Sequence, residues 1–467
     1  MPLMTAHTPN SSFLSAKTGY ATSPRPSPNR KPVLPSVWRR VLMALIALGG
    51  LALLVSALDS PVMEQITGTV HIDQDIGKDT TWHANRTYVL ETDVFVHGGA
   101  RLTIEPGTRI LGEHGSSLIV ARESQLIARG TRSAPIVFTS AQDVGERARG
   151  DWGGVVLLGE DRTNEAFARV EGVDGRDIRG HFGGQVEEGS CGELTFVRIE
   201  YAGYEAFPGN ELNGLTLGGC GPDTVLEHIQ VHKALDDGIE FFGGSASMRH
   251  VLITGARDDS LDWDLGWNGR VQHLIIQQHT GEGDRGFEGD NSPERDDARP
   301  RSTPEFSNVT LISNSGEHTA MVLRSGTAGR FGNILIAGYG THPIDLRDPL
   351  TGSLLEHNQL AFDSLLIESS RSIEQIWPAE TGEKNNDAGV DEATVFAAPT
   401  QTAEKLFTQN ARNPRQPVFR PGMQAYREQA SWPSDSDFWD RSATYYGAVD
   451  PQVSNPWYLG WTDFSEN

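Results

Sequence analysis

The sequence predicts an all-β protein whose main domain is a parallel β-helix, a solenoid of stacked coils with three short strands each. Three observations predict this fold class. Short β-type runs punctuated by glycine begin at about Val89, one strand pattern recurs about every 22 to 25 residues, and a short acidic phrase occurs three times between Ala234 and Asn291. A fixed period in this range is typical of a solenoid.

The N-terminal segment before this domain has a different composition. Residues 1–36 are rich in Ser, Thr and Pro, which predicts a disordered cytoplasmic tail. Residues 37–58 contain Arg39, Arg40 and then the uncharged run VLMALIALGGLALLVSAL, which predicts a transmembrane signal anchor. The inner membrane is then the partner of residues 41–58, and the β-helix lies in the periplasm or outside the cell. Cleavage near Ala57, which gives a secreted protein, is the alternative.

The repeat defines the expected domain limits. Residues 59–88 are expected to be a linker and N-terminal cap, and residues 89–375 the β-helix. Lines such as VLEHIQVHKA, SMRHVLITGA and RVQHLIIQQH share one apolar, variable, polar, apolar-x-apolar pattern. At about 3.3 Å per strand residue plus turns, one period is one three-strand coil. Residues 376–467 are expected to form an irregular cap, since an open solenoid end exposes unpaired strand edges.

A column of polar residues follows the repeat at one position of each coil. Three imidazoles one coil apart could hold a metal ion. The column continues with asparagine and serine, however, which favours a ladder of short polar side chains that satisfy turn backbone groups. The members of this ladder are Arg198, His228, His250, His273, Asn308, Asn333 and Ser364.

The acidic phrases ALDDGIEFFGG, ARDDSLDWDLG and EGDRGFEGDN place carboxylates on one face of successive strands, because neighbouring side chains in a strand alternate faces. Carboxylates stacked at about 4.8 Å need cations, arginines or raised pKa values. Continuing the alignment through EHTAMVLRSG and THPIDLRDP gives three columns. The first is Glu240, Asp262, Glu288, Val322 and Asp345, the second is Phe242, Asp264, Asp290, Arg324 and Arg347, and the third is Asp236, Asp258 and Asp284.

Calcium is the cofactor expected at this acidic face, because carboxylate oxygens suit a hard divalent cation. Phe242 and Trp267 could offer rings to a sugar beside Asp290. The formal net charge of −23 argues against nucleic acid as a partner. The candidate metal ligands are Glu240, Asp262, Asp264, Glu288 and Asp290.

Several motifs carry a family resemblance, namely GDWGG, ELNGLTLGG, LDDGIEFFGG, DDSLDWDLGW, RSGTAGRFGN and the ending WYLGWTDF. With them the chain resembles the pectate-lyase-like superfamily of right-handed parallel β-helices. Within it, the chain is similar to a group of exported bacterial proteins often labelled only by fold or as multidrug transporters. The resemblance implies a right-handed, single-stranded β-helix. In polysaccharide lyases of that superfamily, the polar ladder lies between the second and third strands and the acidic site lies on the first.

Cys191 and Cys220 are the only cysteines, and each lies a few residues ahead of the ladder position in consecutive coils. Export makes oxidation available, so a disulfide between stacked coils is expected.

Two function classes stay open at this stage. The first is an exported binding or scaffold protein that presents its acidic, calcium-binding face to an acidic glycan or an envelope protein. The second is a calcium-dependent polysaccharide lyase or glycoside hydrolase that uses the same face on an acidic polysaccharide. Calcium would acidify the proton next to a uronate carboxyl group and an arginine could take part in its removal, whereas paired carboxylates suit hydrolysis. The candidate catalytic residues are Asp262, Asp264, Arg324 and Arg347.

Overall fold

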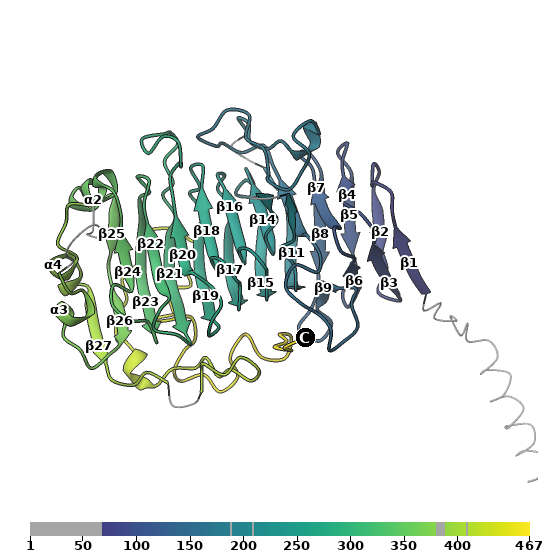
Figure 1. The fold of residues 1–467 in the computed structure, drawn as a ribbon. Coiled ribbons are helices and arrows are strands. Elements are labelled where there is room, and N and C mark those ends of the chain that lie inside the picture. The colour runs from purple at the N-terminus through teal and green to yellow at the C-terminus, as the bar shows by residue number, and fades with distance from the viewer. Residues whose placement is uncertain (1–67, 187–188, 208–209, 380–387, 408–409) are drawn as a thin grey trace, which may run out of the picture. The chain divides into compact units, whose positions relative to one another are not determined.

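The computed structural model describes residues 68–186, 189–207, 210–379, 388–407 and 410–467, which form stacked coils of parallel strands (Figure 1). This confirms the predicted all-β, parallel β-helix architecture. The expected tail 1–36, the anchor 37–58 and the alternative cleavage site near Ala57 lie outside the described residues. Across the described part of the chain, no helix is long and apolar enough to cross a bilayer.

Two large parallel sheets form the walls of the solenoid, and a small antiparallel pair, β12 (Glu205–Phe207) and β13 (Asn210–Glu211), lies outside them. The 16-stranded sheet, sheet A, contains β1 (Gly68–Ile72), β2 (Thr80–Trp82), β3 (Arg86–Leu90), β5 (Arg101–Ile104), β6 (Arg109–Gly112), β8 (Gln125–Arg129), β9 (Ile136–Ser140), β11 (Gly192–Glu200), β15 (Val225–His232), β17 (Ser247–Thr254), β19 (Arg270–Gln278), β21 (Glu305–Ser313), β23 (Gly329–Ala337), β25 (Leu360–Phe362), β26 (Leu365–Glu368) and β27 (Thr400–Ala403). The 9-stranded sheet, sheet B, contains β4 (Val94–Val96), β7 (Ser117–Val120), β10 (Gly154–Leu158), β14 (Leu215–Gly218), β16 (Ile239–Phe242), β18 (Leu261–Asp264), β20 (Arg285–Gly289), β22 (Thr319–Leu323) and β24 (Ile344–Leu346).

The long strands of sheet A bend at one residue with left-handed backbone, so that one continuous strand forms two sides of a coil. The bend occupies the predicted ladder position at His228, His250, His273, Asn308 and Asn333, where φ lies between 55° and 62°. Histidine and asparagine suit this position because both are enriched among residues with positive φ. The first member of the ladder was predicted wrongly: Thr195 pairs with Glu227 and Val197 with Ile229. Phe196, and not Arg198, therefore lies opposite His228.

The interior of the coils is filled by apolar side chains from both sheets, as strand alternation requires. Ile239, Phe241, Leu261, Trp263 and Phe287 of sheet B all have 0% exposure, as predicted. Aromatic rings continue the core toward the C-terminal end, where the ring centroids of Phe306 and Phe331 lie 5.2 Å apart. The side chains at the outward positions of the same strands are therefore free of the core and available for binding or catalysis.

The stack of strands extends beyond the expected limits of 89 and 375 at both ends. β1 already pairs with β3 from Gly68, and β27 pairs with β26. The far end of the core is closed by three short helices, α2 (Pro349–Glu356), α3 (Ile373–Ile376) and α4 (Glu392–Ala397), with Leu354, Ile376 and Phe396 buried. This end is therefore closed by helices, and not only by the irregular cap that the sequence predicts.

The C-terminal strap, defined as residues 410–467, runs back along the outer face of sheet A instead of covering the last coil (Figure 1). It contains one short 3₁₀ helix, η2 (Met423–Ala425). Outward apolar residues of sheet A, such as Leu252 and Ile275, form one buried cluster with Phe419, Tyr446 and Tyr458 of the strap. The strap thus buries a second core outside the coils.

The cover loop, defined as residues 159–186, packs on the outer face of sheet B. It includes the 3₁₀ helix η1 (Ile178–Gly180). Ala168, Val170 and Phe182 of this loop form a buried cluster with outward residues of sheet B, among them Ile119 and Val156. The cover loop therefore reaches the sheet that carries the predicted acidic columns.

Candidate functional site

The structure assembles the predicted columns in the predicted register. Glu240 pairs with Asp262, and Asp262 pairs with Glu288. The column continues through Val322 to Asp345. We call the carboxylates gathered here the acidic row. It consists of Asp236, Asp237, Glu240, Asp258, Asp259, Asp262, Asp264, Asp284, Glu288 and Asp290.

Carboxylate oxygens converge closely at one end of the acidic row. Three groups of three side chains bring one oxygen each within 4.8 Å of one another. Because the groups share Asp237 and Asp258, they form one continuous patch of oxygen atoms. The groups are Asp236 with Asp237 and Asp258, Asp237 with Glu240 and Asp262, and Asp258 with Asp259 and Asp284. Oxygens gathered in this way are what a calcium ion needs.

Arginines neutralise the other end of the acidic row. Arg324 Nη2 lies 2.8 Å from Glu288 Oε2, and Arg324 Nε lies 3.0 Å from Asp290 Oδ1. Arg285 Nη1 lies 2.6 Å from Glu288 Oε1 and 3.2 Å from Asp259 Oδ2. The uncompensated negative charge is therefore concentrated toward Glu240 and Asp262.

The electrostatics of the acidic row follow from burial and mutual repulsion. Burial, reinforced by neighbouring carboxylates, raises the pKa of Asp237, Glu240, Asp262 and Asp264 well above the usual range. Burial and the charge of Asp258 raise the pKa of Asp236 to about 7. Without a cation, some carboxyl groups of the row are therefore protonated at neutral pH, which reduces their mutual repulsion.

Arg324 stays a cation in this setting. Burial alone would lower the pKa of its guanidinium, but Asp290 and Glu288 outweigh burial and raise the pKa. Arg347, the other arginine of the predicted catalytic set, pairs with Asp345 at 2.9 Å. Both guanidinium groups are therefore engaged by carboxylates.

The acidic row has a closed side and an open side. On the closed side, Asn164 of the cover loop donates through its backbone N–H to the Leu265 carbonyl at 2.9 Å, and its amide contacts the Asn291 carbonyl at 2.7 Å. The Asp264 Oδ1 atom is buried and has no hydrogen-bond partner among the described residues. On the open side, the Asp284 side chain is 55% exposed and Asp258 is also exposed. A cation could thus be enclosed by the row and still be reached at this edge.

The two predicted sugar-stacking rings are not on the surface. Trp267 has 0% exposure, stacks on Phe241 with ring centroids 4.1 Å apart, and donates to the Ala246 carbonyl. Its prediction as a ligand-binding residue was wrong, because Leu265 and Gly266 adopt left-handed backbone and the chain turns Trp267 into the core. Phe242 is 9% exposed and lies against Phe182 of the cover loop.

Another aromatic side chain is presented to solvent. Phe167, in the cover loop, is 88% exposed and has a φ of 71°, a strained conformation for a bulky residue. It borders a cavity of about 740 Å³ that Arg122, His181 and Arg299 also line. The cover loop has no periodic pattern of apolar residues, so sequence reasoning missed its exposed ring.

Asp237, Asp259 and Asn213 were not among the predicted candidate site residues. Asp237 Oδ1 accepts from the Asp259 N–H at 2.9 Å, and Asp259 Oδ1 accepts from the Arg285 N–H at 2.8 Å. Asn213 donates from Nδ2 to Glu240 Oε2 at 2.5 Å. The second aspartate of each Asp-Asp pair therefore links one coil to the next, and the pairing in sequence was the available signal.

Cys191 and Cys220 form the predicted disulfide, with their Cα atoms 5.6 Å apart. Cys191 directly precedes β11 and Cys220 follows β14, so the bond ties neighbouring coils together beside the base of the cover loop.

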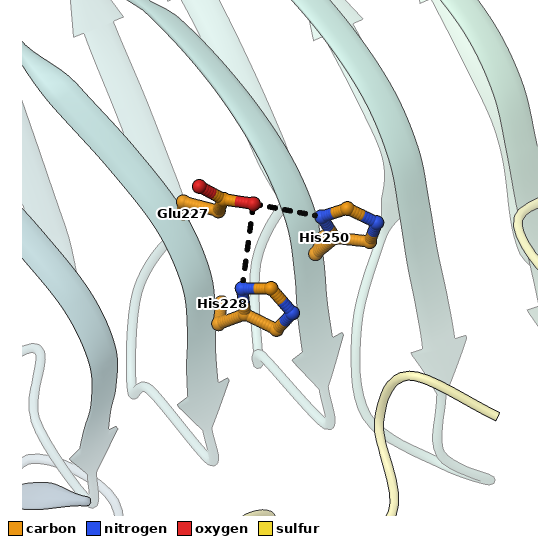
Figure 2. Close-up of side chains that lie close together, drawn as sticks. All are labelled: Glu227, His228 and His250. Carbon is orange, nitrogen blue, oxygen red and sulfur yellow. Dashed lines mark ion pairs between the residues drawn. The ribbon is translucent and has the colours of Figure 1, made fainter. Parts of the chain in front are cut away.

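The ladder on sheet A forms a stack of rings, of which Figure 2 shows those of His228 and His250. The His228 and His250 ring centroids lie 4.6 Å apart, those of His250 and His273 4.8 Å apart, and Phe196 stacks on His228 at 4.2 Å. The asparagines further along bind the strap: Asn308 donates to the Tyr445 carbonyl at 2.7 Å. Asn308 therefore has the structural role that the changing chemistry of the ladder predicts.

Comparison with known proteins agrees with this geometry. Neither a curated protein nor a solved structure matches the chain significantly. The family model of the pectate-lyase-like β-helix domain matches residues 74–410, a range that includes the strands of both large sheets from β2 to β27. The parallel strands, the stacked coils and this match together show that the chain belongs to the pectate-lyase-like β-helix domain family.

Proposed function

We propose that this chain is an exported, membrane-anchored β-helix protein whose acidic row binds calcium and presents a binding surface to a glycan or an envelope protein. The observation that carries the proposal is the convergence of carboxylate oxygens around Asp237, Glu240 and Asp262, within 4.8 Å of one another. Arg285 and Arg324 neutralise the side of the row that carries Asp259, Glu288 and Asp290. A divalent cation would remove the remaining repulsion.

Two features of the sequence and structure support the proposed anchor and export. The apolar run from Val41, with Arg39 and Arg40 before it, supports a helix that crosses the inner membrane. The disulfide between Cys191 and Cys220 suits an oxidising compartment such as the periplasm.

A thermal melt of the full chain in detergent tests the calcium site. Calcium that binds only the folded state stabilises it by about 2.7 kcal/mol at 100 times its Kd. We expect calcium to raise the melting temperature of the EDTA-treated chain. The variant combining Asp237→Asn and Asp262→Asn should melt higher than the parent without calcium, because it relieves repulsion, and should lose the calcium response.

The matched control is Asp345→Asn, which removes a carboxylate of the same column outside the acidic row. This control should keep the full calcium response. An equal calcium shift in the double variant and the parent would contradict the proposal.

The cover loop supports the binding role. Phe167 offers an exposed ring beside a cavity with Arg122 and Arg299, a combination that suits an acidic sugar. On an array of acidic glycans, Phe167→Ala should lose binding that the parent shows. Val144→Ala, a control at another exposed apolar residue, should retain it. Binding that survives Phe167→Ala would remove this surface from the proposal.

Polysaccharide cleavage at the same face is the second candidate, favoured by the contact of Arg324 with Glu288 and Asp290. The raised pKa of Arg324, in which Asp290 and Glu288 outweigh burial, argues against its acting as a base. Incubation with acidic polysaccharides and calcium, followed by the absorbance of unsaturated products and by reducing ends, distinguishes the two. Activity abolished by Arg324→Ala and by Asp262→Asn would establish the enzyme instead.

A further inference from the structure

A second cluster of metal-ligating side chains lies on sheet A, on strands other than those of the acidic row. Glu227 and His228 are neighbours on β15, and His250 occupies the ladder position on β17 (Figure 2). One ligand atom from each lies within 4.8 Å of the other two. Figure 2 shows the Glu227 carboxylate beside both imidazole rings, with its nearer oxygen facing the Nδ1 atom of each.

The distances suit a small tetrahedral metal ion. Glu227 Oε1 lies 3.6 Å from His228 Nδ1 and 3.3 Å from His250 Nδ1. Ligands at about 2.1 Å from a tetrahedral zinc ion are about 3.4 Å apart from one another. Two of the three distances between ligand atoms are therefore already close to those that a zinc ion requires. Calcium would need more oxygen ligands than these three side chains supply.

The histidine nitrogens that face Glu227 lack other partners. The Nδ1 atoms of His228 and His250 are both buried and accept or donate no hydrogen bond within the described part of the chain. The His273 Nδ1 atom, in a side chain that is only 3% exposed, is in the same condition. A run of unsatisfied nitrogens is unusual in a folded protein, because each costs about 1–3 kcal/mol. A bound ion would satisfy those at His228 and His250.

The surroundings of the cluster shield one side of it and leave room for a further ligand on another. Trp457 and Trp461 of the strap lie edge-on to His228 and shield one side. Glu227 also lines a cavity of about 360 Å³ with Arg249 and Arg270, from which water or an anionic oxygen could reach the ion.

We propose that Glu227, His228 and His250 bind one transition-metal ion of the zinc class, with a fourth position open to the neighbouring cavity. The two rings stack with an interplanar angle of 16°, so their lone pairs do not yet converge. Coordination turns the rings about the soft Cβ–Cγ bond until both Nδ1 atoms face the ion. The ion then joins two coils beneath the strap.

Cobalt spectroscopy tests this site separately from the acidic row. The full chain in detergent is stripped with EDTA, saturated with calcium to occupy the acidic row, and titrated with Co²⁺. Tetrahedral Co²⁺ absorbs visible light far more strongly than Co²⁺ in an octahedral oxygen site. We expect a strong band that saturates at one equivalent and is abolished by one equivalent of Zn²⁺.

The ladder itself supplies the substitution that preserves the backbone. Asn308 and Asn333 occupy the same position with φ of 55° and 57°, so His228→Asn and His250→Asn fit the left-handed bend. Both variants should lose the band, and His273→Asn should keep it. If either of the first two variants fails to fold by circular dichroism, Glu227→Gln decides, and it should also lose the band.

Three results would overturn the proposal. They are the absence of a saturable strong band in the parent, a band of equal intensity in folded His228→Asn and His250→Asn, and a band that persists in Glu227→Gln but disappears in His273→Asn. The calcium response of the acidic row stays intact in every one of these cases, so failure here is distinct from failure of the proposed function.

Discussion

At the scale of the residue, the backbone at the ladder positions is as important as the side chains. Asn308 has a φ of 55° and donates to the Ala443 carbonyl at 3.1 Å and the Tyr445 carbonyl at 2.7 Å. Replacing it with glycine removes these hydrogen bonds but relieves the left-handed strain. Replacing it with alanine removes the bonds and keeps the strain, which costs about 1–2 kcal/mol for a residue with a Cβ atom.

We therefore predict that Asn308→Ala is less stable to urea than Asn308→Gly by about 1 kcal/mol, with both less stable than the parent. At positions with negative φ the order is the opposite, because alanine is there the more stabilising of the two residues. Equal stability of the two variants, or greater stability of the alanine variant, would contradict the assignment of the bend to this residue.

Individual residues also show how far the sequence could predict the acidic row. The columns through Glu240, Asp262 and Glu288 were correct because a two-residue strand period leaves no freedom once inward residues such as Trp263 are recognised. Trp267 was wrong because it follows a turn, where that period no longer holds. The direction of a side chain after a left-handed turn depends on backbone angles, and the residue types alone do not determine those angles.

At the scale of the element, side chains of the coils bind the strap through hydrogen bonds to its backbone. The Gln230 side-chain amide makes two hydrogen bonds with Asp463, at 2.5 Å to its carbonyl and at 2.9 Å from its N–H. The Ser465 carbonyl accepts from Tyr201 and contacts His232 Nε2, each at 2.8 Å. These contacts join the end of the chain to coils that lie far earlier in the sequence.

Removal of residues 460–467 is predicted to lower the melting temperature strongly. It exposes the polar groups of Gln230 and His232 and deletes Trp461, which is 2% exposed; loss of one such tryptophan costs about 3–5 kcal/mol. Differential scanning calorimetry of the full and truncated chains measures the effect. The calcium response should remain in the truncated chain, since the acidic row lies on sheet B, and an unchanged melting temperature would show that the strap does not stabilise the coils.

The elements also divide into those that the sequence predicts and those that it does not. The long strands repeat at a constant period, so their existence and stacking could be predicted. The strap and the cover loop have no period, and their apolar residues, such as Phe182 and Tyr458, resemble those of any loop. Their positions depend on which outward faces of the coils need to be covered, and this is known only once the coils are built.

At the scale of the whole molecule, the chain has a formal net charge of −23. Calcium and protons compete for the carboxylates of its acidic row. The carboxylates of the acidic row have pKa values raised by burial, so the folded state without calcium binds more protons than the unfolded state near neutral pH. Its stability should therefore increase as pH falls through those raised values toward the unfolded pKa of about 4. Calcium should stabilise the folded state at higher pH, above the raised pKa values, where the carboxylates are ionised.

The most direct measurement of the central claim is isothermal titration calorimetry of calcium into the full EDTA-treated chain at pH 7, in two buffers of different ionisation enthalpy. Because calcium replaces protons on Asp237, Glu240 and Asp262, we predict saturable binding with a net release of protons to the buffer. Both should disappear when Asp237→Asn and Asp262→Asn are combined, and both should persist in Asp345→Asn. The absence of saturable binding in the parent, or equal binding and proton release in the double variant, would contradict the assignment of the acidic row as a calcium site.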